Sequence, residues 1–385
     1  MRKRIWLAAG GSLLAAASGL LGPAALANAS TQTSPLVGYT YVNDNTPGVN
    51  TIAGFGRHAD GSLTPLPGSP FAAGGAGLGA GLASQGAIEA AWDGRYLLAV
   101  DAGSNQISVL RVAQGGALQQ VGEPVSSGGV KPVSVAVSPS GLVYVANSGA
   151  GGSDYSGFRL SFGGTLTPIP GSTVTVPDSS GLGDVFFNGW GNHLIGTRTG
   201  TSEIDSFLVL PGGHLLTAPG SPYAGQGLGQ LGAKFSPARP SQLFVSNAHN
   251  GAGLGTVSAY RDSFFGRLSS IGSSPYADGQ TAPCWVEISQ DGRYLYTVNT
   301  GSGTVSSYAV NRDGSLTLIG STPISSGGAS IDARLSPDGR YLLVDGAGMH
   351  VVSVFAVQGG GGLTELASSP TPLPAGSSSA GIVNL

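Results

Sequence analysis

The chain has 385 residues, of which 66 are glycine and only 10% are charged, and its formal net charge at pH 7 is −3. This charge, with no basic cluster beyond the first few residues, argues against a nucleic-acid partner. The single cysteine, Cys284, excludes an intramolecular disulfide, so stability has to come from packing.

Residues 1–29 have the pattern of a secretory signal peptide. The basic residues Arg2 to Arg4 precede an apolar run at 5–21, and small-x-small cleavage sites follow at 25–27 and 27–29. A membrane anchor is less favoured because this run is short, and no other run approaches the ~18 apolar residues of a membrane span. We therefore expect a secreted, extracellular protein without a membrane span after cleavage. Retention at the cell envelope is left open.

From residue 37 onward the chain repeats one pattern. Its clearest copy, residues 289–328, contains three β-prone runs separated by turn sequences such as Asp291-Gly292, and a fourth run at 285–289 precedes it. Four short β-prone runs joined by hairpin-type turns predict one antiparallel, four-stranded sheet.

Each copy is marked by the glycine that opens its last predicted strand. The markers recur at intervals of 48–55 residues, a range in which sequence repeats indicate propellers or arrays. They are Gly61, Gly116, Gly164, Gly213, Gly266, Gly314 and Gly362. One sheet alone leaves its apolar faces uncovered, whereas seven sheets arranged radially cover one another. The sequence therefore predicts an all-β, seven-bladed β-propeller of four-stranded antiparallel blades, forming a single domain at residues 30–385.

The first predicted blade is completed by the C-terminus. Residues 380–385 have the pattern of a first strand with no blade after it, whereas residues 37–42 are typical of a second strand. We therefore expect the C-terminal strand to join the N-terminal blade and close the ring. The blades are predicted at 37–73 with 380–385, 87–129, 132–177, 181–227, 231–280, 282–328 and 330–376.

A glycine-rich segment, residues 72–86, separates the first two predicted blades. It lacks the G-x-G-x-x-G spacing of a dinucleotide-binding loop, and no βαβ unit surrounds it. We interpret it as a flexible connector.

The segments SQDGRYLYTVN at 289–299 and SPDGRYLLV at 336–344, with the hairpins that follow them, resemble the YVTN-like repeats of the seven-bladed propeller lactonase family. That family includes the bacterial 6-phosphogluconolactonase type and fungal carboxymuconate cyclases, and the resemblance extends over essentially the whole mature chain. It implies hydrolysis or formation of a lactone ring without a cofactor. In the family, His, Arg and Glu side chains near the inner strands polarise the lactone carbonyl and manage proton transfer.

The family's catalytic His and Arg positions are not retained in this sequence. A Pro-His or Pro-Arg pair often begins an inner strand in the family, whereas in this chain Val133 follows Pro132 and Cys284 follows Pro283. Three functions therefore stay open. One is a secreted hydrolase of a small lactone. The second is a catalytically degenerate propeller that binds an extracellular ligand or protein. The third is a structural envelope or adhesion protein.

Candidate site residues come from one position of each inner strand, five residues before the turn glycine. We call these seven equivalent positions the column. The positions on either side of them are almost wholly apolar. Because side chains alternate between the two sides of a strand, the column lies on one side of each inner strand. Charged side chains are rarely buried unless paired, so we expect the column to face the central channel. It reads Glu89, Ala136, Phe186, Lys234, Glu287, Arg334 and Asn384, and two positions earlier lie Asp184, Trp285 and Asp332.

In the catalytic interpretation, a glutamate of this column is the general base and a cation steadies a carboxylate or oxyanion. The predicted catalytic residues are Glu89, Glu287 and Arg334. The predicted substrate-binding residues are Lys234, Asp184, Trp285, Asp332 and Asn384. In the structural alternative, ion pairs such as Glu287 with Arg334 tie neighbouring blades together.

The expected partner is a small-molecule lactone or another extracellular ligand, bound by a monomer. No Cys/His metal-ligand spacing is present, so no metal is expected. The family resemblance implies that no other cofactor is needed. A phosphorylated lactone is disfavoured because the sequence offers no Lys/Arg cluster suited to a phosphate.

Overall fold

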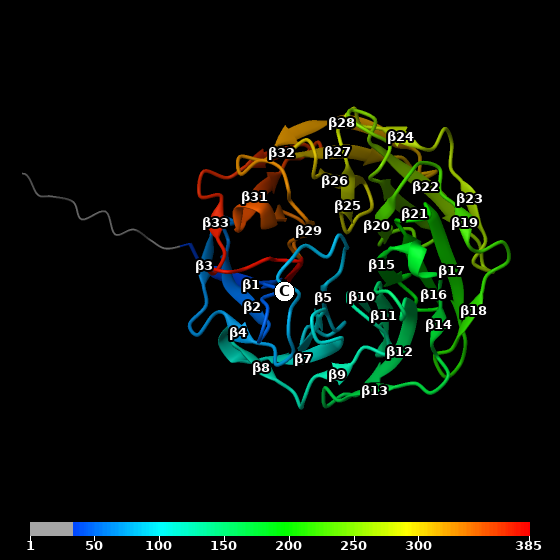
Figure 1. Ribbon diagram of the computed structural model, residues 1–385. Coiled ribbons are helices and arrows are strands. Elements are labelled where there is room, and N and C mark those ends of the chain that lie inside the picture. Colours follow the sequence, from blue (N-terminus) through cyan, green and yellow to red (C-terminus); the bar gives the residue numbers. More distant parts are fainter. Residues whose placement is uncertain (1–33) are drawn as a thin grey trace, which may run out of the picture. The chain divides into compact units, whose positions relative to one another are not determined.

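Seven antiparallel sheets surround one axis in the structure, a computed structural model that describes residues 34–385 (Figure 1). The predicted all-β, seven-bladed propeller is confirmed. The predicted signal peptide at 1–29 lies outside the described residues. Within the described part of the chain, no helix is long and apolar enough to cross a membrane.

Each sheet forms one blade, and the blades are numbered from the N-terminus, with strands in order from the innermost outward. Blade 1 contains β34 (Gly381–Asn384), β1 (Leu36–Asn43), β2 (Thr51–His58), β3 (Leu63–Pro65) and β4 (Phe71–Ala72). Blade 2 contains β5 (Ile88–Ala90), β6 (Tyr96–Asp101), β7 (Gln106–Val112), β8 (Leu118–Gln120) and β9 (Val125–Ser126). Blade 3 contains β10 (Pro132–Val137), β11 (Leu142–Asn147), β12 (Asp154–Leu160), β13 (Leu166–Pro168) and β14 (Val174–Thr175).

The remaining blades follow the same order. Blade 4 contains β15 (Leu182–Phe187), β16 (His193–Arg198), β17 (Glu203–Val209), β18 (Leu215–Thr217) and β19 (Tyr223–Ala224). Blade 5 contains β20 (Gln230–Phe235), β21 (Gln242–Asn247), β22 (Thr256–Asp262), β23 (Leu268–Ser270) and β24 (Tyr276–Ala277). Blade 6 contains β25 (Pro283–Ile288), β26 (Tyr294–Asn299), β27 (Thr304–Val310) and β28 (Leu316–Pro323). Blade 7 contains β29 (Asp332–Leu335), β30 (Tyr341–Gly346), β31 (Val351–Val357), β32 (Leu363–Glu365) and β33 (Thr371–Pro372). Short 3₁₀ helices occur at η1 (Gln114–Gly116), η2 (Asp178–Ser180) and η3 (Ala347–Met349).

The outermost strand is split into two short pieces in every blade except blade 6, and both pieces pair with the third strand. In blade 1 the split holds Ser69-Pro70, and the Ser69 hydroxyl accepts a hydrogen bond from the Gly54 amide at 2.8 Å. Proline has no amide proton to give to a ladder, so the serine takes over one backbone contact where regular pairing stops. In blade 6 the outermost strand β28 is continuous, with one bulge opposite β27.

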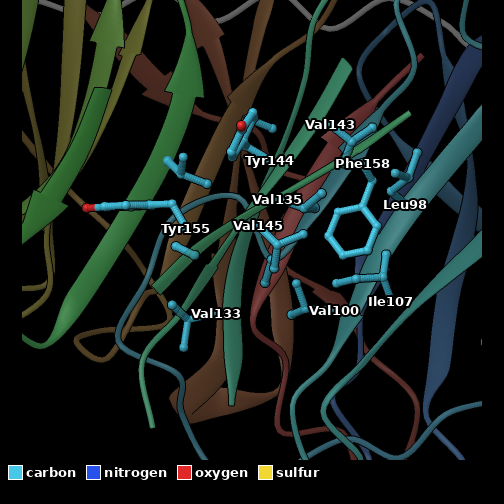
Figure 2. Close-up of a cluster of buried hydrophobic side chains, with 14 of the residues drawn as sticks. Leu98, Val100, Ile107, Val133, Val135, Val143, Tyr144, Val145, Tyr155 and Phe158 are labelled. Carbon is cyan, nitrogen blue, oxygen red and sulfur yellow. The ribbon is translucent and has the colours of Figure 1, made fainter. Parts of the chain in front are cut away.

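Neighbouring blades cover each other's apolar faces. Figure 2 shows this packing between blades 2 and 3, where Val143 and Val145 of β11 meet Leu98 and Val100 of β6 in one buried cluster. Tyr144, between the two valines in sequence, points to the other face of β11, and its hydroxyl donates to the Gly213 carbonyl of blade 4 at 2.6 Å. Every residue of β11 is buried, because both of its faces are covered.

The marker positions require glycine because a side chain of the preceding blade occupies the space that a Cβ atom would need. Gly164 has φ +86°, and a Cβ there would lie about 2.5 Å from the Tyr96 ring of blade 2. In blade 7 the glycine with this role is Gly361, with φ +82°, which lies against Tyr294 of blade 6. The marker predicted at Gly362 is therefore displaced by one residue: the positive φ and the side-chain contact from the preceding blade define the position, and both belong to Gly361.

The ring closes through the C-terminal strand, as predicted. β34 pairs antiparallel with β1, with Tyr41 opposite Val383 and Val42 opposite Ile382. Ile382 is fully buried and Val383 is 3% exposed. Blade 1 therefore takes its innermost strand from the opposite end of the chain.

Buried carboxyl groups lie along this closure. The Asp44 side chain accepts hydrogen bonds from Ser377 Oγ at 3.0 Å and Thr51 Oγ1 at 2.8 Å, and Asp345 accepts one from Ser379 Oγ at 2.7 Å. Burial raises the pKa of Asp44 to about 6, against the opposing effect of both hydroxyl donors. The pKa of Asp345 also rises well above its usual value, again because of burial. Ionising these groups at neutral pH costs stability.

We expect Asp44→Asn to stabilise the protein at neutral pH. Because the pKa of Asp44 is raised to about 6 in the folded state, that state retains a proton between about pH 4 and pH 6 that the unfolded chain has released. The contribution of this group to stability therefore falls as the pH rises through that window. An asparagine stays neutral and can pair with both hydroxyls. The variant should match the wild type near pH 4 and exceed its free energy of unfolding by up to about 3 kcal/mol at pH 7.

Urea unfolding of both proteins from pH 4 to pH 7 measures this difference. The control is Asp313→Asn, an exposed aspartate whose pKa is lowered by the Ser315 backbone and hydroxyl hydrogen bonds, so its removal should give no gain. A difference for Asp44→Asn that stays constant across the window would contradict the expected burial effect.

Candidate functional site

A cavity of about 250 Å³ occupies one end of the central channel. Its rim includes Gly189, Ser236 and Pro237, which follow β15 and β20, and Gln85 and Gly86 also line it. The column predicted to face the channel contributes five lining residues, namely Glu89, Ala136, Phe186, Lys234 and Arg334. The other lining residues are Val135, Val137, Asp184, Val185, Phe187, Ala233 and Phe235.

Four charged side chains from four blades form one network beside this cavity. Arg334 Nη2 lies 3.0 Å from Glu89 Oε2, and Arg334 Nη1 lies 3.8 Å from Glu287 Oε2. Lys234 Nζ lies 3.2 Å from the same Glu287 oxygen. Neither contact of Glu287 Oε2 has hydrogen-bond geometry, so this carboxylate is held by charge. The three predicted catalytic residues and Lys234 are thus brought together.

The two glutamates differ in their access to the cavity. The Glu89 side chain is 30% exposed and lines the cavity, whereas the Glu287 side chain is 8% exposed, does not line the cavity and contacts Lys234 and Arg334. Burial lowers the pKa of Arg334, but Glu89 and Glu287 outweigh it and hold that pKa above its usual value. The guanidinium therefore stays charged, and of the two glutamates Glu89 is the one that a bound molecule can reach.

Asp184 also lines the cavity, at the junction of three blades. Its Oδ1 accepts a hydrogen bond from Ser134 Oγ of blade 3, and its Oδ2 accepts one from the Ala233 amide of blade 5, both at 3.1 Å. Burial raises the pKa of Asp184 well above its usual value, and the same hydrogen bonds oppose the rise. Its role in this structure is to join neighbouring inner strands at the cavity wall.

The other three predicted substrate-binding residues, Trp285, Asp332 and Asn384, do not line the cavity. Asp332 is fully buried and accepts a hydrogen bond from the Ile382 amide at 3.3 Å, and burial raises its pKa to about 6 although Arg334 opposes this. Asn384 accepts a hydrogen bond from Thr40 Oγ1 and donates to the Arg334 carbonyl at 2.9 Å. Asp332 and Asn384 therefore link β29 to β34 beside Arg334 and do not form the cavity surface.

The last residues of the glycine-rich segment, Ser84 to Gly86, form a plug in the channel. The prediction of a flexible connector is wrong for these residues. Ser84 and Gln85 are each 2% exposed. The Gln85 amide pairs with both backbone groups of Val286, at 3.1 Å each, and the Gln85 backbone N–H donates to the Gly183 carbonyl at 3.0 Å. Trp285 Nε1 donates to the Ser84 carbonyl at 2.8 Å. Gln85 thus caps the open edge of β25, because an innermost strand has a neighbouring strand on one side only.

The sequence did not predict the contact of Gln85 with β25, because a glycine-rich segment has no periodic pattern of apolar residues. One signal was present: Gly232 lies inside the inner strand β20, and a Cβ there would overlap Gln85 Oε1. A glycine inside a strand often marks a close approach by another part of the chain. The partner itself could not be identified without the fold.

No group of three or more His, Cys, Asp or Glu side chains within residues 34–385 is placed to hold a metal ion.

Residues 242–377, from the second strand of blade 5 to the end of blade 7, match the family model described as "Lactonase, 7-bladed beta-propeller". This part of the chain is similar to the lactonase family. The predicted family resemblance is confirmed there, and the matching segment contains Glu287 and Arg334 of the charged network. No curated protein is detectably similar in sequence.

Solved structures share the fold over nearly the whole propeller. The periplasmic gluconolactonase of Pseudomonas aeruginosa has a TM-score of 0.74 at 18% identity, covering 90% of this chain and 99% of that chain. A proposed 6-phosphogluconolactonase of Bacteroides uniformis has a TM-score of 0.71 at 20% identity, with the same coverage of both chains. The corresponding protein of Bacteroides fragilis has a TM-score of 0.70 at 20% identity, covering 92% and 99%. At 18–20% sequence identity, these structural similarities establish the shared fold only.

We expect Gln85→Ala to destabilise the protein by about 2–4 kcal/mol. The substitution leaves a buried N–H and a buried C=O of Val286 without partners, and each such group costs about 1–3 kcal/mol. Gln358→Ala removes an exposed glutamine from a turn and should cost less than about 0.5 kcal/mol. Urea unfolding at neutral pH measures both. Equal, small losses would mean that the plug is not fixed by Gln85.

Proposed function

We propose that the protein is a secreted hydrolase that opens the ring of a small lactone in the channel cavity. The observation that carries the proposal is the convergence of Glu89, Lys234, Glu287 and Arg334 beside a cavity whose inner end is plugged. The match of residues 242–377 to the lactonase family and the signal-peptide pattern at the N-terminus support it. Ester hydrolysis needs a base for water and a donor for the developing oxyanion, and this site offers both.

In the proposed reaction, Glu89 takes a proton from a water molecule whose oxygen attacks the lactone carbonyl carbon. The negative charge that develops on the carbonyl oxygen is stabilised by the Lys234 ammonium, which lines the cavity and is 25% exposed. The ring C–O bond then breaks, and the leaving oxygen receives the proton from Glu89. The product is the hydroxy acid, which ionises at neutral pH.

Glu287 and Arg334 are positioning residues in this scheme. Glu287 lies between Lys234 and Arg334 and fixes both cations, and Arg334 in turn holds Glu89 at 3.0 Å. Their burial prevents them from reaching the substrate as freely as Glu89 and Lys234 do.

A second candidate function is ligand binding without catalysis. It is favoured by one observation: both glutamates are held in ion pairs with the cations of the site, an arrangement that also stabilises a ring of blades. In this alternative the cavity takes up an extracellular ligand, and the charged network serves to align the inner strands.

The test is lactone hydrolysis by the purified mature chain, followed by pH-stat on a panel of sugar-derived, alkyl and aryl lactones. Glu89→Gln should lower kcat by about 10²–10⁴-fold, the usual contribution of a general base, while leaving the fold intact by circular dichroism. Glu123→Gln is the matched control, since this exposed glutamate lies outside the cavity lining and should leave kcat unchanged.

Two results would reject the hydrolase. One is wild-type turnover that Glu89→Gln does not reduce. The other is the absence of turnover on every lactone of the panel from folded protein, and in that case binding of the same lactones would support the second candidate.

A further inference from the structure

We infer that the substrate is an uncharged lactone with a small apolar or aromatic substituent, rather than a phosphorylated or polyhydroxylated one. This inference rests on the proposed function, because it assigns the substrate class of the same cavity. It comes from the uneven distribution of polar and apolar groups around the channel.

The channel-facing column divides into two arcs. Going round the ring, the five consecutive blades 5, 6, 7, 1 and 2 contribute polar residues, whereas blades 3 and 4 contribute Ala136 and Phe186. The cavity lies against the apolar arc: Val135 and Val137 of β10 line it together with Ala136, and Phe187 lines it beside Phe186. Asp184 of β15 also lines the cavity on this side, but it is only 3% exposed. A bound molecule therefore meets charge on one side and mainly hydrocarbon on the other.

The apolar wall is aromatic where it meets Lys234. Phe186 of β15 and Phe235 of β20 are in edge-to-face contact, with ring centroids 5.5 Å apart, and both line the cavity. Phe235 directly follows Lys234 in the chain. When the lactone carbonyl lies at Lys234, a substituent on the ring can pack against the Phe186 face, which is only partly buried by the protein.

The charge balance of the site argues against a phosphate. Lys234 and Arg334 are the two cations that line the cavity, and Glu287 and Glu89 compensate them one for one. A phosphate dianion would have to break these pairs and would then face two carboxylates. An uncharged ring leaves the pairs in place.

The volume sets a limit on size. At about 250 Å³ the cavity is smaller than the 300–1,000 Å³ of sites for drug-sized ligands. A five- or six-membered lactone with one phenyl or short alkyl group is therefore the class that fits, and a long acyl chain has to extend beyond the rim.

The first measurement is the specificity ratio of the wild type. We expect kcat/KM for γ-phenyl-γ-butyrolactone to exceed that for glucono-δ-lactone by at least about tenfold, the smallest factor typical of apolar contacts in a pocket. Phe186→Ala should reduce this ratio by about tenfold through a higher KM for the phenyl lactone. Phe162→Ala removes an 83% exposed phenylalanine outside the cavity lining and is the matched control.

Binding of unreactive lactams separates this inference from the proposed function. Calorimetric titration with 5-phenyl-2-pyrrolidinone and with gluconolactam needs no catalysis, and the wild type alone suffices if Phe186→Ala does not fold. Preferential binding of the phenyl lactam without hydrolysis of any lactone supports the ligand class and rejects the hydrolase. Equal or tighter binding of gluconolactam, or no binding of either lactam, overturns the ligand class. Hydrolysis that favours the sugar lactone overturns it as well and leaves the hydrolase standing.

Discussion

No blade of this protein can bury both of its faces alone, and the rest of the structure depends on this constraint. Each sheet is covered by its two neighbours, so the ring has to close for any blade to be stable. Closure is supplied by β34, whose Ile382 and Val383 are buried beside β1. Contacts such as Tyr96 against Gly164 repeat the same coupling from blade to blade. The glycines of the repeat therefore reflect neighbouring side chains rather than turn geometry alone.

The same radial arrangement creates the candidate site. It places one position of all seven inner strands around a single channel, where the chain can collect charges that are far apart in sequence. Charges in such a confined place have to be paired. The chain Lys234–Glu287–Arg334–Glu89 satisfies this need, and leaves Lys234 and Glu89 exposed to the cavity at its two ends. Structure and proposed chemistry thus use the same ion pairs, which is why stability and activity must be measured separately for variants of this network.

The sequence predicted those parts of the molecule that the repeat controls. The propeller, the closure by residues 380–385 and the convergence of Glu287 with Arg334 all follow from aligning equivalent positions. The plug could not be predicted this way, because the contact of Gln85 with Val286 joins an irregular segment to a strand about 200 residues away. Trp285 and Asp332 show the same limit: the repeat placed them on inner strands, but only the packing shows that one contacts Ser84 and the other the closing strand.

The most direct test of the proposed site is the crystal structure of the protein with a bound hydroxy acid, 4-hydroxy-4-phenylbutanoate, the product of the phenyl lactone. The expected result is a carboxylate within hydrogen-bond distance of Lys234 Nζ, near Glu89, with the phenyl ring against Phe186 and the Gln85 plug in place. A product molecule bound outside the channel cavity, or bound there with its carboxylate away from Lys234, would contradict the proposed site.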